Sequence, residues 1–448
     1  MYLKEIQHIY FIGIGGIGMS AIARYLMMNN KCVAGFDKVE TEITKALEIE
    51  GADIHFIDSL ALIPSDFKNS KTTLVVYTPA VQKDHAEFNY FIDNGFAILK
   101  RSQLLGEITK STFCFAVAGT HGKTTTSTIL GHIMKESGLN ATSFLGGISE
   151  NYHSNLILGG DLVSVVEADE FDRSFLYLSP NIACITSMDA DHLDIYGKKD
   201  ILGKSFVEFS EKVSDTLVVC KGLPIEGLTY AVEEEADYYA ENVKIQNGSY
   251  VFDVMTPTEI IRDVAFNLPG KHNMLNAVAA LAMANIYGVS LQSIAKALLS
   301  FKGVRRRFSY RIKTKNLVLI DDYAHHPTEI CAVESTVREM YPGQKVLAVF
   351  QPHLYSRTRD FEEEFAASLS KFDEVILLDI YPARELPIEG VTSERLLNKI
   401  NCCKKKLATK NNLIDLIKKS QASIKTILGA GDIGELVDDI TKQLKGEN

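Results

Sequence analysis

Residues Ala116–Thr126 read AVAGTHGKTTT, and the interpretation of the whole chain starts from this stretch. The apolar run Phe113–Ala118 predicts a β-strand that stops at Gly119, and a helix is expected from Gly122 to about Lys135. Glycines between a strand and a helix let successive backbone N–H groups converge on a phosphate, and the helix N-terminus adds its positive dipole end. The stretch therefore predicts a nucleotide-binding loop.

The side chains of this loop have separate expected roles. Lys123 is placed to reach the outer phosphates, and the Thr124 hydroxyl to hold Mg²⁺. Val117 stands where the full pattern has a glycine, so the loop is a shortened variant that begins at Gly119. The alternative is an ordinary surface Gly-Lys turn. The order of strand, turn and helix favours nucleotide binding.

The composition is that of an ordinary globular protein. The 448 residues suffice for about three domains, and the net charge of -10 argues against general nucleic-acid or membrane-surface binding. The seven cysteines are scattered without metal-ligand spacing, as is typical of reduced thiols. Because we find no cleavable signal pattern and no run long enough to cross a bilayer, we expect a cytoplasmic protein that binds neither nucleic acid nor membrane.

A second glycine-rich turn lies near the N-terminus. The apolar strand Ile6–Ile12 leads into GIGGIG at Gly13–Gly18, a helical pattern follows, and Asp37 ends the next strand at about the spacing of a ribose-binding carboxylate. A dinucleotide is the obvious ligand, but such a turn binds the diphosphate of any nucleotide. Alternating strands and helices to about Gly106 predict a small doubly wound domain.

Acidic strings follow two strands of the central segment. Leu162–Val166 leads into EADE, which starts at Glu167, and Ile182–Thr186 leads into MDADHLD, which contains His192. Oxygen ligands at strand ends beside a phosphate loop suit a magnesium nucleotide. Either string alone is more typical of a solvated loop or a helix cap, but the two together favour a site.

Polar residues further along the chain leave more alternatives open. Asn273 and Asn276 share one helix face, where their amides could hold a nucleotide or cap the helix. The three arginines at 305–307 suit interdomain pairing and phosphate binding equally. In the last segment, strands lead into DDYAHHPTE at 321–329 and QPHLYSRTRDF at 351–361. Histidine and arginine at strand ends suit carboxylate or phosphate recognition, although a His-His-Pro turn can also be a packed loop.

The order of these strings resembles that of the Mur ligases over nearly the whole chain. The strings are GIGGIGMS, GTHGKTTT, EADE, MDADHLD, PGKHNMLNA, RRRF, DDYAHHPTE, QPHLYSRTRDF, YPARE and VTSE. The resemblance implies an α/β protein of three domains: a Rossmann-like domain for a UDP-sugar at 1–106, a central P-loop-like ATPase domain with a mostly parallel sheet at 107–304, and a C-terminal Rossmann-like domain at 305–448.

The resemblance also implies an activity, namely ATP-dependent amide formation in peptidoglycan precursor synthesis. A phosphoryl group passes to the lactyl carboxylate of UDP-N-acetylmuramate, and the amine of L-alanine attacks the acyl phosphate to release ADP and phosphate. Such catalysis consists mostly of positioning and charge neutralisation, and it needs no enzyme nucleophile. The cofactors that the resemblance implies are ATP and two Mg²⁺ ions.

Roles for individual residues follow from the same resemblance. The expected catalytic residues are Lys123, His192 and Arg357. The expected ATP contacts are Ala118, Gly119, Thr120, His121, Gly122, Lys123, Thr124, Thr125, Asn273, Asn276 and Arg307. The expected UDP-sugar contacts are Gly15, Gly16, Ile17, Gly18 and Asp37. One Mg²⁺ is assigned to Thr124 and Glu167, and a second to His192. The substrate carboxylates are assigned to Tyr323, His325 and Arg357.

One position departs from the family pattern, which commonly reads QPHRYTRT. This chain has Leu354, so Arg357, Arg359 or Arg384 is expected to share the task of the missing arginine. Three other functions remain open at this stage. They are a recycling ligase that adds a tripeptide, a nicotinamide-dependent oxidoreductase, and a regulatory protein that binds nucleotides without catalysis.

Overall fold

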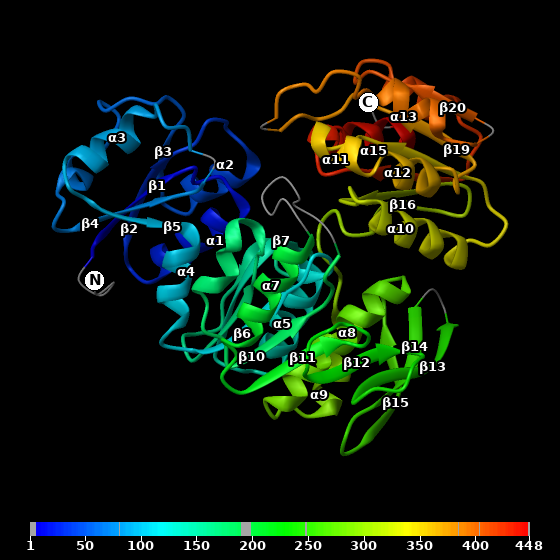
Figure 1. The fold of residues 1–448 in the computed structure, drawn as a ribbon, viewed down its shortest axis with the longest axis horizontal. Helices are drawn as coiled ribbons and strands as arrows, with labels where there is room; N and C mark the ends of the chain where they lie inside the picture. The colour runs from blue at the N-terminus through cyan, green and yellow to red at the C-terminus, as the bar shows by residue number, and fades with distance from the viewer. Residues whose placement is uncertain are drawn as a thin grey trace. The chain divides into compact units, whose positions relative to one another are not determined.

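The structure is a computed structural model that describes residues 6–79, 81–189, 199–246, 249–383, 385–402 and 404–446. The chain divides into two compact units. The first unit comprises Met1–Glu241, Asp253–Val264 and Asn276–Phe301, and the second comprises Asn242–Phe252, Ala265–Leu275 and Lys302–Asn448. Three β-sheets follow one another along the sequence (Figure 1). The sequence predicted an α/β protein, and the structure confirms this fold class.

The first sheet has five parallel strands in the order β3-β2-β1-β4-β5. The strands are β1 (His8–Ile12), β2 (Cys32–Phe36), β3 (Asp53–His55), β4 (Thr73–Tyr77) and β5 (Ala97–Lys100). The helices are α1 (Ile17–Met28), α2 (Glu42–Ile49), η1 (Ser65–Lys68), α3 (Ala86–Asp93) and α4 (Arg101–Thr109). Alternate residues of β1 enter different cores. Ile9 and Phe11 pack with residues of α1 and α4, and Tyr10 and Ile12 pack with Phe91 of α3. Helices therefore cover both faces, as in a doubly wound domain.

The second sheet has ten strands in the order β15-β14-β13-β12-β11-β10-β6-β9-β7-β8. The strands are β6 (Phe113–Ala118), β7 (Ala141–Ser149), β8 (Ser154–Ile157), β9 (Val163–Glu167), β10 (Ile182–Ile185), β11 (Thr216–Cys220), β12 (Leu228–Val232), β13 (Tyr238–Gln246), β14 (Ser249–Met255) and β15 (Ile260–Phe266). The helices are α5 (Lys123–Glu136), η2 (Phe171–Tyr177), α7 (Lys199–Ser210), α8 (Lys271–Ile286) and α9 (Leu291–Ser300). Strand β6 pairs in parallel with β9 on one side and β10 on the other. The phosphate loop after β6 therefore lies between the two acidic strand ends.

The hairpin of β7 and β8 was not expected from the sequence. It packs on α1, the helix that follows the first glycine-rich turn. The buried side chain of Asn155 on β8 donates from Nδ2 to the carbonyl oxygen of Ile17 at 2.5 Å and to Oγ of Ser20 at 2.8 Å. Arg24 on α1 donates to Oδ1 of the same asparagine. The hairpin therefore fixes α1 to the second sheet. Helix α4 runs through position 106, where we placed the first domain boundary, and both boundaries stay predictions.

The third sheet has six strands in the order β16-β17-β21-β18-β19-β20, and β16 pairs antiparallel with β17. The strands are β16 (Ser309–Lys313), β17 (Val318–Asp322), β18 (Val346–Phe350), β19 (Glu374–Leu377), β20 (Lys404–Leu407) and β21 (Ile424–Leu428). The helices are α10 (Pro327–Met340), α11 (Tyr355–Asp360), α12 (Glu362–Leu369), α13 (Ser393–Lys399), α14 (Leu413–Lys419), η3 (Asp432–Leu436) and α15 (Val437–Lys445). Ile320 and Leu319 enter separate cores on opposite faces of the sheet. This sheet is therefore also covered by helices on both faces.

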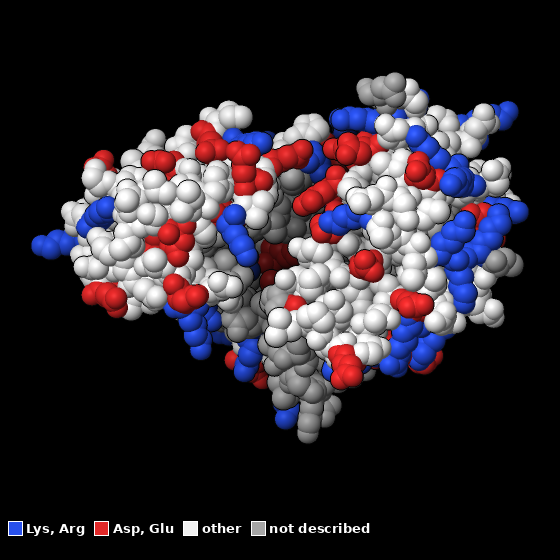
Figure 2. All heavy atoms as spheres, turned by 90° about the horizontal axis from the view of Figure 1, so that it is seen from above, with Lys and Arg blue, Asp and Glu red and all other residues white. Residues whose placement is uncertain are grey.

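The charged side chains are mixed over the surface drawn in Figure 2. Acidic groups stand among the basic ones on the described residues of that face, in keeping with the net charge of -10. Among the helices of the described ranges, none combines the length and the apolar character needed to span a membrane.

Candidate active site

The phosphate loop takes a backbone conformation that requires glycine at two positions. Gly119 has φ of 130° and Gly122 has φ of 84°, a region that residues with a Cβ rarely adopt. A Cβ on Gly122 would lie 2.5 Å from Oδ1 of Asn276. Helix α5 begins at the next residue, Lys123, so the loop ends on a helix N-terminus, as expected for a phosphate site.

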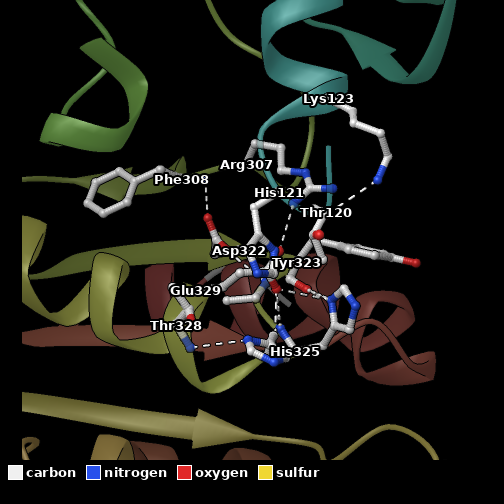
Figure 3. A network of polar contacts seen from close by, with 12 residues as sticks. Thr120, His121, Lys123, Arg307, Phe308, Asp322, Tyr323, His325, Thr328 and Glu329 are labelled. Atoms are coloured by element: carbon white, nitrogen blue, oxygen red, sulfur yellow. Dashed lines mark hydrogen bonds and ion pairs between the residues drawn. The ribbon is translucent and has the colours of Figure 1, made fainter. Parts of the chain in front are cut away.

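Lys123 is folded back over its own loop. Its Nζ donates to the carbonyl oxygen of Thr120 at 3.3 Å (Figure 3). It also donates to the carbonyl oxygen of Gly119 at 2.6 Å and to Oε1 of Glu170 at 3.0 Å. The second carboxylate oxygen of Glu170 lies 2.8 Å away, and the two side chains are 13% and 1% exposed. Burial alone would lower the pKa of Lys123, but Glu170, Asp169 and Glu167 together raise it above its ordinary value. The lysine is therefore a buried cation whose counter-ion is a buried carboxylate.

The acidic string after β9 reaches three different elements. Oε2 of Glu167 accepts from the amide of Gly146 on β7 at 3.1 Å. Oδ2 of Asp169 lies 3.7 Å from Nη2 of Arg101 at the start of α4. Glu170 pairs with Lys123. Of these carboxylates, Glu167 was predicted as a metal ligand, whereas the partner of Lys123 was not predicted.

The segment after β10 contacts the other side of the phosphate loop. Oγ1 of Thr120 donates to the carbonyl oxygen of Asp189 at 3.0 Å, and Nε2 of His121 lies 3.3 Å from Oδ2 of the same aspartate. The amide of His121 donates to Oγ of Ser187 at 2.8 Å. The predicted ligand His192 lies outside the described residues. Elsewhere in the described ranges, no three His, Cys, Asp or Glu side chains gather as a metal cluster.

The two predicted asparagines of α8 are both buried. Oδ1 of Asn276 accepts from Oγ1 of Thr126 on α5 at 3.1 Å, so this amide lies beside the phosphate loop. Nδ2 of Asn273 donates to the carbonyl oxygen of Pro269 at 2.6 Å. Asn276 thus lies at the phosphate loop, whereas Asn273 makes a local contact near the start of α8.

The first glycine-rich turn lines a pocket of about 730 Å³. The amide of Gly15 donates to Oδ2 of Asp37 at 2.7 Å, so the predicted ribose-binding carboxylate lies directly at the turn. Gly16 precedes α1 as its N-cap, and Ile17 and Gly18 form its first turn. The pocket wall also contains Asp58, Thr78 and His85, which the sequence analysis did not identify. A cavity of this size with a few polar groups is typical of a small-ligand site.

In the second unit, the predicted residues are connected by aromatic and polar contacts. Two guanidinium groups lie near the ring of Tyr323, with Cζ of Arg306 at 5.2 Å and Cζ of Arg307 at 5.1 Å from its centroid. Nδ1 of His325 lies 3.0 Å from the carbonyl oxygen of Tyr323, and the amide of His325 donates to Oε2 of Glu329 at 2.9 Å (Figure 3). Tyr323, His325 and Arg307 therefore share one site.

Arg357 joins the same group through a second histidine. The rings of His325 and His353 are 6.0 Å apart, and Nη1 of Arg357 donates to Nδ1 of His353 at 3.2 Å. Arg357 is 6% exposed, whereas Arg359 is mostly exposed and pairs with its neighbour Asp360. Arg384, the third candidate, lies outside the described residues. Among the described candidates, Arg357 is the one that lies with the other predicted residues.

Asp322 fixes the backbone of the same unit. Its carboxylate accepts from the amide of Phe308 at 2.6 Å and from that of Ala324 at 2.7 Å. Burial raises the pKa of Asp322 to about 6, against the effect of Arg307 and of these two N–H groups. The carboxylate thereby connects the arginine-rich turn at 305–307 to the end of β17.

Comparison with known proteins places the chain in a family. The model of the Mur ligase family, catalytic domain, matches residues 8–112, that of the Mur ligase middle domain residues 117–284, and that of the Mur ligase, glutamate ligase domain, residues 306–433. The chain belongs to the Mur ligase family. The resemblance inferred from the sequence strings is thereby confirmed.

Individual Mur ligases match over nearly their full length. The chain is 59% identical over 446 residues to a UDP-N-acetylmuramate–L-alanine ligase of Flavobacterium psychrophilum, which covers 99% of each chain. It is similar to the crystal structure of the UDP-N-acetylmuramate-alanine ligase MurC from Thermotoga maritima, with a TM-score of 0.84 and 29% identity over 98% of this chain and 99% of that one. A murein peptide ligase mpl from Psychrobacter arcticus, at 21% identity and a TM-score of 0.71 over 98% of each chain, shares the fold.

Proposed function

We propose that this Mur ligase joins L-alanine to the lactyl carboxylate of UDP-N-acetylmuramate at the expense of ATP. The observation that carries the proposal is the presence of two helix-N-terminal phosphate loops in one unit, one with Lys123 and the other beside a pocket of about 730 Å³. A ligase that phosphorylates a sugar-nucleotide carboxylate needs one phosphate loop for ATP and another for the sugar nucleotide. The near-identical length and 59% identity of the Flavobacterium relative support the choice of substrates.

The nucleotide half of the reaction is assigned to the loop after β6. Residues 118–125 contact the triphosphate of ATP, Lys123 neutralises charge on the transferring phosphoryl group, and Asn276 borders the loop. The chemistry of the donors fits a magnesium nucleotide, because Mg²⁺ prefers one or two protein oxygens together with phosphates and water. Thr124 at the helix start and Glu167 at the end of β9 would hold this ion, which would neutralise phosphate charge. His192 is assigned to a second ion.

The sugar-nucleotide half is assigned to the first sheet. Gly15, Gly16, Ile17 and Gly18 are assigned to the diphosphate, which accepts from backbone N–H groups at the start of α1, and Asp37 is assigned to the ribose. This reading also explains why the turn carries no lysine. The backbone and the helix dipole of the turn suit a diphosphate that takes no part in the reaction.

The carboxylates of the substrates are assigned to the second unit. Arg357 is buried and hydrogen-bonded to His353, so its guanidinium is held for a planar carboxylate. Tyr323 and His325 line the same site, and Arg307 contacts ATP. Leu354 contributes no charge, and we assign the function of the missing arginine to Arg357.

The decisive experiment measures ADP release with UDP-N-acetylmuramate and one amino acid or peptide at a time. We expect turnover with L-alanine and much less with a tripeptide. A strong preference for the tripeptide would instead identify a recycling ligase. Binding of NAD by the first sheet, with no binding of UDP-sugars, would identify an oxidoreductase. Nucleotide binding without any ADP release would indicate a regulatory protein that does not catalyse the reaction. Since all the substrates are metabolites of the cytoplasm, we place the reaction there.

A further inference from the structure

The side chain of Arg101 lies over the last glycine of the first phosphate loop. A Cβ on Gly18 would lie 2.5 Å from Nη1 and 3.2 Å from Cζ of this arginine, so the guanidinium occupies the space beside the Cα of Gly18. Arg101 is the first residue of α4, and its side chain is 23% exposed. The guanidinium is therefore mostly buried at the start of α1, where the diphosphate is expected.

The charge of Arg101 is incompletely compensated at this place. Gly18 belongs to the first turn of α1, and the N-terminus of a helix carries the positive end of the dipole, which repels a cation. The counter-ion is Asp169, whose Oδ2 lies 3.7 Å from Nη2, too far for a hydrogen bond. No other residue of the described ranges hydrogen-bonds to the guanidinium or forms an ion pair with it. The guanidinium of Arg101, with its five N–H donors, thus lies beside a helix N-terminus that itself attracts anions.

We propose that Arg101 binds the diphosphate of the sugar nucleotide, together with the backbone N–H groups of the loop. The proposal rests on the sugar-nucleotide site described under the proposed function and adds a side chain to it. A planar guanidinium suits two phosphate oxygens at once, and a diphosphate would supply the negative charge that both the arginine and the helix end lack.

The arrangement also connects the two nucleotide sites. Asp169 pairs with Arg101 at the first phosphate loop, and the next residue, Glu170, pairs with Lys123 at the second. Four consecutive residues at the end of β9 thus supply a counter-ion to the cation of each loop.

The test compares UDP with uridine as probes of the full-length chain by isothermal titration calorimetry. We expect Arg101→Gln to weaken binding of UDP by about 10- to 100-fold, the size of a lost charge-assisted contact, and to leave binding of uridine within about twofold. Arg101→Lys keeps the charge but loses the planar guanidinium, and its affinity for UDP is expected to lie between those of the wild type and Arg101→Gln. The matched control is Arg173→Gln, which removes an arginine that is 50% exposed and paired with Glu208.

Each outcome distinguishes this inference from the function on which it rests. If the wild-type chain binds neither UDP nor uridine, the proposed function fails. If the wild type binds both and Arg101→Gln binds them unchanged, the inference fails while the function stands. An equal loss for UDP and uridine also overturns it, because the arginine then acts only on the fold. Affinity for ATP reports whether Arg101→Gln is folded; if it is lost, the same comparison is made with Arg101→Lys.

Discussion

Removal of Lys123 should destabilise the protein even when no nucleotide is bound. The lysine is the counter-ion of Glu170, whose side chain is 1% exposed, and the two groups make contacts of 2.8 and 3.0 Å. Removing one partner of a buried pair leaves the other charge uncompensated, at a cost of about 3–5 kcal/mol. Because Lys123 itself is 13% exposed, we expect Lys123→Met to cost about 3 kcal/mol, near the lower limit.

The assay is equilibrium unfolding in urea without nucleotide. The chain has no tryptophan, so far-UV circular dichroism or the fluorescence of its 18 tyrosines reports the transition. Lys135→Met is the matched control, because this exposed lysine lies near the end of the same helix and, within the described part of the chain, its side chain donates to the carbonyl oxygen of Leu158 alone. Its effect is expected within about 0.5 kcal/mol.

The double variant Lys123→Met with Glu170→Gln separates stability from catalysis. Replacing both members of a buried pair by neutral groups of similar volume is often neutral, so most of the lost stability should return. Release of ADP should stay absent, because the charge on the transferring phosphoryl group remains unpaired. If the double variant is instead as unstable as the sum of the two single variants, the ion pair contributes nothing and our reasoning is refuted.

Three further predictions test other residues of the site. Gly122→Ala should weaken ATP binding at least tenfold, because the added Cβ collides with Asn276 and the backbone conformation becomes strained. The control is Gly138→Ala, which has φ of 72° and nothing within 4 Å of the added Cβ, so it shows the cost of strain alone. Equal effects of the two substitutions in ATP titrations would contradict this prediction. Glu167→Gln should raise the Mg²⁺ concentration needed for half-maximal ADP release several-fold, and an unchanged requirement would exclude Glu167 as a ligand. The raised pKa of Asp322, about 6, means that the folded state loses stability as pH rises through this value. Relative to Asp322→Asn, the wild type should lose about 1 kcal/mol of unfolding free energy between about pH 5 and pH 7, and a difference that does not vary with pH would contradict the shift.

Much of the fold could be predicted because parallel sheets carry a strong local signal. Buried strands followed by glycines, as at β1 and β6, fix the start of the next helix within a residue or two. The same signal identified Gly15, Gly119 and Glu167, since groups at the carboxyl ends of neighbouring parallel strands meet at one edge. The residues of the second unit needed the family resemblance, because His325 and Arg357 are far apart in the sequence and are brought together around His353.

The remaining residues depend on contacts that no local pattern encodes. Arg101 lies 83 positions after Gly18 in the sequence, and Glu170 lies 47 positions after Lys123, so neither pair can be read from spacing. The hairpin of β7 and β8 was missed because its residues, such as Gly146 and Gly147, have little preference for strands. A signal was available for Glu170, since it belongs to the acidic string that had already been singled out.

The asparagine that secures helix α1 to the hairpin has a consequence for which ligands can react. Because Asn155 holds the helix of one phosphate loop against the sheet that carries the other, the separation of the two loops is built into the protein and is not set by its ligands. We therefore expect the first unit to select sugar nucleotides by their length. A sugar nucleotide with one phosphate more or fewer would present its carboxylate at the wrong distance from ATP, however well its base and sugar were bound.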